Sequence, residues 1–201
     1  TVLEPRILRV LDADHRDGMV YVVNEWGAGT SVDIMVTGEG PLSPRRAAWV
    51  TAEVAASMSV AHARRIPHGR LVPENVLIDQ AGSVRLIGFC VDAALHGLPP
   101  GDLSQDVTDI GGLLYFLLTG KWSGQSPSSM PTALRDHDRW LRPRQVRAGI
   151  TDLAARCGAA EAERGQFALL HLAADGLGQK GIVGMDGGFP RAPQRRRFLA
   201  E

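Results

Sequence analysis

The sequence predicts an α+β fold in which short paired strands are combined with a mostly helical second part. Two observations support this. Residues 68–89 hold two short apolar runs on either side of the turn sequence Asp79-Gln80-Ala81-Gly82, a pattern typical of paired strands. Residues 43–61 and 104–118 carry apolar side chains at helical spacing or nearly all the way round.

The beginning of the chain predicts a β-hairpin. Residues 7–13 alternate well enough for a strand, residues 14–18 form a turn, and residues 19–23 read as a second strand. Gly27-Ala28-Gly29 then loosens the chain before a short helix, expected over residues 31–36 with Ser31 as its cap.

Two longer helices are expected after the hairpin. The first begins at Ser43-Pro44 and ends before Pro67, and its apolar residues fall on one face. These residues are Ala47, Val50, Val54, Met58 and Ala61. The second runs from Ser104 to Leu118, is apolar on several sides and stops at Gly120. A polar loop over 123–130, a basic stretch over 135–147 and weaker helices over 152–163 and 166–174 follow.

Composition narrows the class of protein. With 201 residues, of which 44% are hydrophobic, the chain is long enough to fold around a core. A formal net charge of +0 argues against nucleic acid as a partner, and two cysteines argue against a disulfide framework. The longest apolar runs are too short for a membrane span, and the mixed charges of residues 4–9 do not read as a signal peptide.

The central stretch resembles the catalytic loop and metal-binding segment of protein kinases, H-R-D-x-K-P-x-N followed by D-F-G. The matching positions are His68, Leu71, Pro73, Glu74, Asn75 and Phe89. The positions that differ from the motif include those that carry the chemistry in protein kinases. Gly69 replaces the motif Arg, Arg70 the catalytic Asp, Val72 the loop Lys, Gly88 the metal-binding Asp and Cys90 the final Gly.

This resemblance implies a protein kinase-like fold with a truncated N-lobe. Residues 1–26 would be the N-lobe remnant, a β-hairpin leading to the hinge, and residues 27–174 the helical C-lobe. Residues 175–201 would be a tail rich in Gly and Arg. Neither a G-x-G-x-x-G loop nor a V-A-I-K-like lysine stands before the hairpin.

The substitutions lead us to expect a pseudokinase without enzymatic activity, cofactor or metal. Arg70 cannot accept a proton at neutral pH, and Gly88 has no side chain with which to hold magnesium. Asn75 offers one neutral oxygen. The alternatives are a divergent Ser/Thr protein kinase fragment that uses unusual residues, and a pseudokinase that senses nucleotide without metal.

Structural roles are expected for the remaining motif residues. His68 should bond the loop backbone and pack near Phe89, Asn75 should brace the loop, and Asp106 should brace it from the second long helix. Arg70 should pair with Asp79, Asp92 or Asp106, or bind an anion. The basic stretch over 135–147 reads as a solvated helix face, or as a contact for a phosphopeptide or lipid headgroups.

Among kinases the sequence looks most similar to the intracellular pseudokinase domain of actinobacterial MviN/MurJ-type peptidoglycan precursor transport proteins. That resemblance implies a regulatory role in cell-wall synthesis. It also implies phosphorylation by an upstream Ser/Thr kinase and recruitment of a forkhead-associated domain protein. The domain itself would be soluble and tethered at the cytoplasmic face of the inner membrane. Thr37 and Thr132, both expected in loops, are weak candidate phosphosites.

Overall fold

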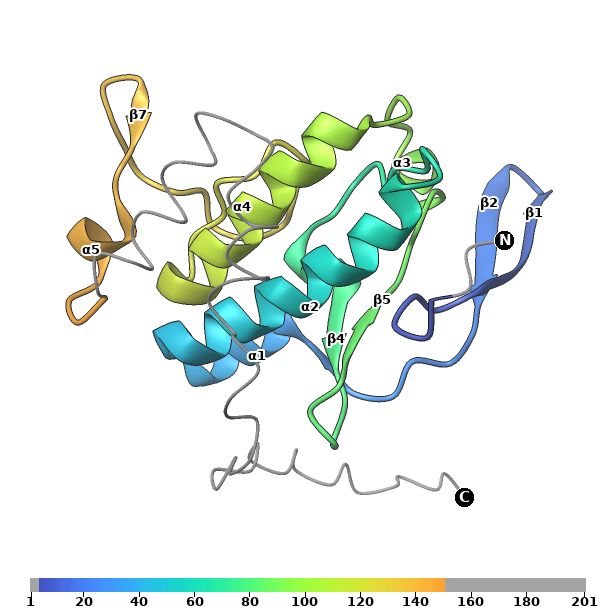
Figure 1. Cartoon of the computed structure of the whole chain (residues 1–201). Helices are drawn as coiled ribbons and strands as arrows, with labels where there is room; N and C mark the ends of the chain where they lie inside the picture. Colours follow the sequence, from blue (N-terminus) through green and yellow to red (C-terminus); the bar gives the residue numbers. More distant parts are fainter. Residues whose placement is uncertain (1–3, 151–201) are drawn as a thin grey trace, which may run out of the picture.

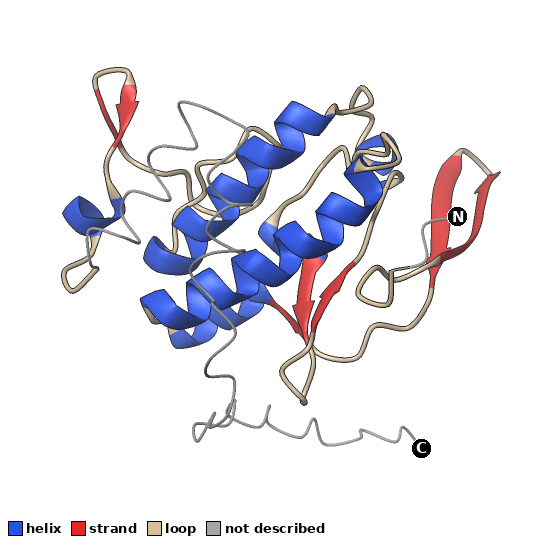
Figure 2. Ribbon diagram, viewed as in Figure 1, coloured by secondary structure: helices blue, strands red, loops and turns tan. Residues whose placement is uncertain are grey.

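The computed structural model describes residues 4–150. The weaker helices expected over 152–163 and 166–174, and the tail over 175–201, lie outside the described residues. Within them, helices and short strands are mixed, as the sequence predicts. Figure 2 shows the long helices lying together beside the central strands, with a separate hairpin at one side.

The predicted N-terminal hairpin is present but shifted along the chain. β1 (Val10–Arg16) pairs antiparallel with β2 (Met19–Asn24), and the turn consists of Asp17 and Gly18, both at positive φ. Ile7, expected in the first strand, forms instead a parallel bridge to Leu86. Figure 1 shows the hairpin projecting away from the helices, and several of its apolar side chains are exposed.

The central sheet is small and antiparallel. Its order is β3 (Thr30–Ser31), β4 (Val76–Ile78) and β5 (Val84–Leu86), so the two predicted strands of the central stretch are confirmed. A short 3-10 helix, η1 (Pro73–Asn75), leads into β4. Backbone bonds from the Leu8 N–H to the Leu86 carbonyl and from the Leu86 N–H to the Arg6 carbonyl tie the start of the chain to β5.

Two long helices supply half of the buried residues in the hydrophobic core of the described chain. α2 (Pro44–His62) begins at the Ser43 cap, whose hydroxyl accepts from the Arg46 N–H, and it buries the predicted apolar face. α4 (Leu103–Thr119) begins one residue before the predicted start, because the cap is the Asp102 carboxylate. Gly120 ends it at φ 72°, in the left-handed conformation that glycine adopts without strain. The two helices pack side by side (Figure 1).

The remaining elements are short. α1 (Val32–Glu39) begins after Ser31, whose side chain makes no capping bond, and extends past the predicted end at Val36. α3 (Asp92–Leu95) follows the central stretch. The basic stretch is not one helix face: it forms the hairpin β6 (Arg135–Asp136) and β7 (Arg139–Trp140), followed by α5 (Pro143–Val146).

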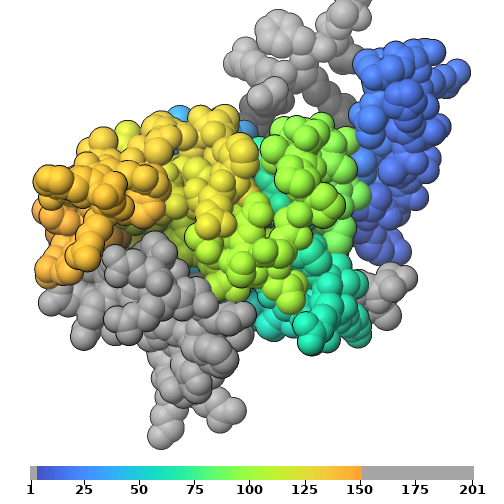
Figure 3. All heavy atoms as spheres, turned by 90° about the horizontal axis from the view of Figure 1, so that it is seen from above, coloured from blue at the N-terminus to red at the C-terminus, as the bar shows by residue number. Residues whose placement is uncertain are grey.

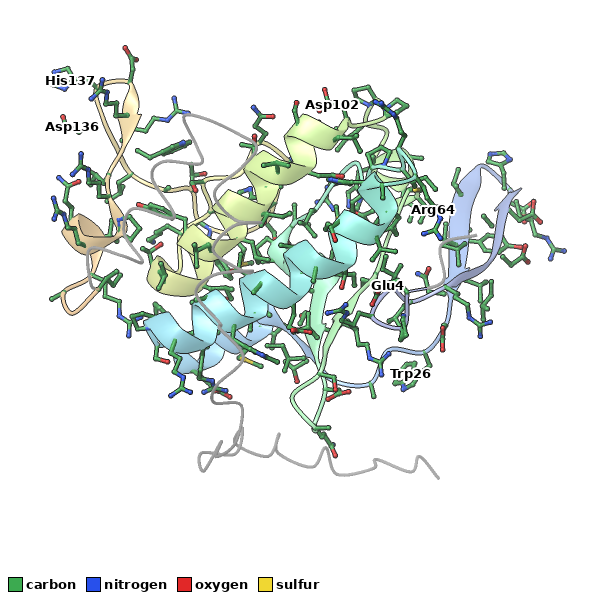
Figure 4. All side chains as sticks on the ribbon, in the orientation of Figure 1. Glu4, Trp26, Arg64, Asp102, Asp136 and His137 are labelled. Carbon is green, nitrogen blue, oxygen red and sulfur yellow. The ribbon has the colours of Figure 1, made fainter. Side chains whose placement is uncertain are left out.

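The two hairpins lie at opposite ends of the described molecule, as Figure 3 shows from above. Figure 4 shows Asp136 and His137 at the tip of the β6–β7 hairpin, and Trp26 after β2. Trp26 is 88% exposed. The expected division of the chain into residues 1–26, 27–174 and 175–201 stays a prediction.

Candidate functional site

The loop after α2 is held by a buried carboxylate from α4. Asp106 accepts the backbone N–H of His68 at 2.7 Å and that of Gly69 at 3.0 Å. Its carboxylate also bonds His62 Nε2 at 2.8 Å, and Asp106 has no exposed surface. Buried backbone donors without partners are costly, so this one side chain fixes the path of the loop.

The His68 ring joins the loop to the segment that directly follows β5. Its Nε2 lies 3.1 Å from the Ile87 carbonyl oxygen, and the ring packs edge-on against Phe89 with centroids 5.2 Å apart. Complete burial lowers the pKa of His68 below its usual 6.5, although the nearby Asp106 carboxylate opposes this. The geometry gives His68 a packing and bonding position inside the lobe.

Arg70 makes a buried ion pair. Its Nη1 donates to Asp92 Oδ2, and its Nη2 donates to the Pro127 carbonyl at 2.7 Å. Arg70 is 7% exposed and Asp92 is 8% exposed. Of the three partners expected for Arg70, the structure therefore selects Asp92, the first residue of α3.

The side chain of Asp92 fills the space beside Gly88. A Cβ at Gly88 would lie 2.8 Å from Asp92 Cβ, which is closer than real contacts allow, and 3.0 Å from Asn75 Nδ2, which is a tight contact. Gly88 has φ +80°, so the backbone also favours glycine here. The motif has thus lost a carboxylate at residue 88, while the fold packs another acidic side chain, that of residue 92, directly beside Gly88.

Asn75 borders this cluster from the end of η1. It is 4% exposed, and its side-chain oxygen Oδ1 is buried without a hydrogen-bond partner in the described structure. Arg70 Nε is buried without a partner in the same way. Buried polar atoms are nearly always bonded, so an orphan acceptor and an orphan donor around one ion pair mark this cluster as unusual.

The loop over residues 123–130, which the sequence predicted only to be polar, is hydrogen-bonded to the site. Glu74 accepts the Ser129 N–H at 2.8 Å, and it also accepts the hydroxyls of Ser128 and Ser129. Burial by itself raises the pKa of Glu74, but these bonds outweigh it and hold the pKa below its usual value. The same loop supplies the Pro127 carbonyl to Arg70.

Asp109 holds the other end of this loop. Its carboxylate has no exposed surface and accepts the backbone N–H groups of Gln125 and Ser126 at 2.7 and 2.9 Å, and also the Ser126 hydroxyl. Burial raises the pKa of Asp109 from 3.8 to about 6, against the lowering effect of these bonds. The sequence could have indicated this role of Asp109 by its position on a helix predicted to be buried, because a charged residue inside such a helix needs hydrogen-bond or ionic partners.

The other motif positions have structural surroundings. Val72 is buried in the core, where the family has a loop Lys. Gly69 has φ +87°, and Gly101 of the following segment packs directly on its backbone. Cys90 is exposed, donates its thiol to the Pro67 carbonyl and keeps φ +65°, a conformation typical of the glycine that it replaces.

The candidate phosphosites belong to elements other than those that form the cluster. Thr37 is exposed but sits in α1 rather than in a loop, because that helix extends to Glu39. Thr132 is exposed and forms a bridge to Trp122. A surface pocket of about 340 Å³ lies between Arg6, Trp49 and the turn after β4, and sequence reasoning gave no sign of it.

The resemblance to protein kinases implies a divalent cation, and the residues of this cluster do not fit one. Gly88 has no ligand atom, Asn75 has one neutral oxygen, and Asp92 already carries the guanidinium of Arg70. A divalent cation about 4 Å from that guanidinium would be repelled by about 8 kcal/mol at an effective dielectric constant near 20. Within residues 4–150, no group of three or more His, Cys, Asp or Glu is placed to hold a metal.

Comparison with known families assigns the class of protein. Residues 1–112 match the family described as the protein kinase domain. This match covers more than half of the 201 residues. The chain therefore belongs to the protein kinase domain family.

Curated relatives place it near bacterial serine/threonine kinases. The chain is 28% identical to serine/threonine-protein kinase PrkC of Bacillus subtilis over 153 residues, which cover 65% of this chain and 24% of PrkC. It is 31% identical to serine/threonine-protein kinase PknD of Mycobacterium tuberculosis over 112 residues, or 56% of this chain and 16% of PknD. The chain thus spans about a quarter or less of these relatives.

These findings correct the expectation that the chain is a pseudokinase and no enzyme. The family is that of the protein kinase domain, and the relatives are named serine/threonine-protein kinases. The physical reason is that a motif read position by position misses substitutes from elsewhere in the chain. Arg70 and Gly88 were taken as lost carboxylates, whereas the structure packs the Asp92 side chain beside Gly88 and pairs it with Arg70.

The family and the relatives named above do not bear on MviN/MurJ-type proteins, cell-wall synthesis or forkhead-associated domains, so these stay predictions. No helix within residues 4–150 combines the length and apolar character needed to cross a bilayer. Attachment at the inner membrane likewise stays a prediction.

Proposed function

We propose that this chain is part of a divergent bacterial Ser/Thr protein kinase, and that it provides the lobe carrying the catalytic loop. The observation that carries the proposal is the intact support of that loop by Asp106, which accepts the N–H groups of His68 and Gly69. The similarity to PrkC, PknB and PknD supports the same conclusion.

In the proposed reaction, the terminal phosphoryl group of ATP passes to a Ser or Thr hydroxyl oxygen, and ADP leaves. Most of the rate enhancement in phosphoryl transfer comes from positioning and charge compensation. A rigid loop with Asn75 at its end can contribute positioning. Arg70 adds no net charge to the site, because its guanidinium is paired with the Asp92 carboxylate.

The absence of a carboxylate at residue 70 removes general-base help. Such help is typically worth about 10²–10⁴-fold in rate. The hydroxyl proton must then leave to solvent or to a phosphate oxygen, and we expect a slow kinase. Slow transfer is compatible with the retained scaffold, because the base is one contribution among several.

The test is phosphate transfer from radiolabelled ATP by the full-length protein, with itself and a general protein substrate as acceptors. Transfer above background that is lost in Asn75→Ala supports the proposal. The matched control is Gln80→Ala, which removes an exposed amide from the turn after β4. No transfer by a folded full-length protein, under conditions in which a related kinase is active, would refute it.

Recruitment of a forkhead-associated domain protein stays a prediction from the resemblance. Such domains read phosphothreonine, and both Thr37 and Thr132 are exposed. Pull-down of the full-length protein before and after treatment with a Ser/Thr kinase would test it. Thr37→Ala and Thr132→Ala would then show which residue matters.

A further inference from the structure

We propose that Ser129 is a phosphorylation site, and that its phosphate detaches part of the loop over residues 123–130 from the candidate catalytic loop over residues 68–75. The phosphoryl group comes from ATP through a Ser/Thr protein kinase. The Ser129 Oγ forms a bond to the terminal phosphorus, the bond from that phosphorus to ADP breaks, and the hydroxyl proton passes to solvent. The inference goes beyond the proposed function, because it does not require this chain to transfer phosphate itself.

Ser129 is the serine of this loop that a modifying enzyme can reach. Ser123 and Ser126 are buried, and Ser128 is partly buried, whereas Ser129 is exposed. The loop over residues 123–130 contains no helix and no strand. Exposed segments of this kind are where proteins are most accessible to enzymes. Exposure therefore selects Ser129 from the four serines of the loop.

The Ser129 hydroxyl lies directly on a carboxylate. It donates to Glu74 Oε1 at 2.8 Å, and the Ser129 backbone N–H donates to the same oxygen, also at 2.8 Å. The Ser128 hydroxyl lies 2.9 and 3.0 Å from the two oxygens of that carboxylate. Burial raises the pKa of Glu74, but hydrogen bonds outweigh burial and hold the pKa below its usual 4.5. Glu74 is thus negatively charged at neutral pH.

A phosphate on Ser129 reverses the sign of this contact. The esterified Oγ has no proton left to donate to Glu74. The phosphate also carries about 1.5 to 2 negative charges at pH 7, and next to a Glu carboxylate this charge disrupts packing by repulsion. A hydrogen bond is therefore replaced by repulsion between like charges, and Ser129 moves away from Glu74.

The consequence is limited to one end of the loop. Glu74 belongs to η1, in the candidate catalytic loop, so the phosphate separates the Ser129 end from that loop. Asp109 belongs to α4 and accepts the N–H groups of Gln125 and Ser126 at the other end. The bonds to Asp109 remain, because they do not involve Ser129. The phosphate thus acts as a switch on how the loop meets the candidate catalytic loop.

The experiment uses the full chain in which Ser129 is replaced by phosphoserine during synthesis. Hydrogen exchange followed by NMR reports on single amides without any phosphate transfer. The N–H of Ser129 bonds Glu74, and the N–H of Met130 bonds the Ser128 hydroxyl. We expect both to exchange about tenfold faster or more, since like-charge repulsion breaks the contact, while Gln125 and Ser126 stay unchanged.

Three comparisons separate charge from other effects. Ser129→Ala removes the hydroxyl without adding charge, so both amides should exchange far more slowly than in the phosphoserine chain. Phosphoserine in place of Ser83, an exposed residue of the turn after β4, is the matched control and should leave the loop unchanged. Adding Glu74→Gln to the chain with phosphoserine at residue 129 removes the repelling charge and should restore most of the protection.

Unchanged exchange at Ser129 and Met130 in the phosphoserine chain would overturn the switch, and so would the same acceleration from phosphoserine in place of Ser83. Circular dichroism establishes that each protein is folded. If the phosphoserine chain does not fold, Ser129→Glu supplies a negative charge at the same position and should give the same change in a smaller amount; no change would overturn the switch as well.

Mass spectrometry of the full-length protein isolated from its native cells tests the modification itself. We expect phosphate on Ser129. Phosphate only on other residues, or none, would overturn the assignment of this site. A full-length protein that transfers no phosphate would bear on the proposed function and leave these results unaffected.

Discussion

Replacing the buried Asp109 by Asn should stabilise the protein at neutral pH and remove part of its pH dependence. The pKa of Asp109 is raised from 3.8 to about 6 in the folded protein. This difference corresponds to about 3 kcal/mol between the two protonation states, at about 1.4 kcal/mol for each tenfold change. Asn keeps an oxygen for the Gln125 and Ser126 N–H groups and is never charged.

The sign follows from the direction of the pKa change. An acid whose pKa is higher in the folded state stabilises the fold fully below pH 3.8, and this contribution is lost as pH rises through about 6. The difference in unfolding free energy between Asp109→Asn and the unmodified protein should therefore grow between pH 4 and pH 7, by up to about 3 kcal/mol.

Urea unfolding followed by circular dichroism at pH 4.5, 6 and 7.5 measures this difference. Asp138→Asn, at an exposed position of the β6–β7 hairpin, is the matched control and should change nothing. A constant difference over this pH range would refute the reasoning. So would an Asp109→Asn variant that is less stable than the unmodified protein at pH 7.5.

Three further outcomes are expected. Asp106→Ala should lower the unfolding free energy by about 3 kcal/mol or more, because two buried N–H groups lose their acceptor, and Asp106→Asn should cost less; urea unfolding distinguishes them. Gly88→Asp should destabilise by about 2 kcal/mol, through the close approach to Asp92 and the positive φ, and the added change Asp92→Ala should recover part of that loss. NMR titration should show the His68 ring still neutral at pH 6.5, because burial lowers its pKa; stability from this group is present above pH 6.5 and is lost as pH falls below it.

Local sequence signals predicted much of the fold. The Ser43-Pro44 start of α2 and the glycine stop of α4 depend on interactions within one turn of helix, so the sequence displays them directly. The β4–β5 pair depends on a tight turn between two apolar runs. The expected helix face over residues 135–147 was wrong, because basic residues at helical spacing do not exclude a hairpin, and here Arg135 stacks on Trp140 across the strands.

The candidate site was predictable only in outline. Motif positions identified the loop, because the spacing from His68 to Asn75 is a local property of the chain. The packing of Asp92 beside Gly88 depends on how α3 folds back after Gly88, and no short motif encodes that. Glu74 and Asp109 form hydrogen bonds with loop residues that are distant from them in the sequence. These bonds could therefore be found only from the three-dimensional structure.

Detection of phosphate transfer by the full-length protein tests the central claim most directly, because the account assigns this chain to a divergent Ser/Thr kinase. Purified full-length protein would be incubated with ATP and its phosphorylated residues located by mass spectrometry, beside an Asn75→Ala variant that circular dichroism shows to be folded. We predict phosphoserine or phosphothreonine on the unmodified protein and none on the variant. Equal phosphorylation of both proteins, or none on the folded unmodified protein, would contradict the account.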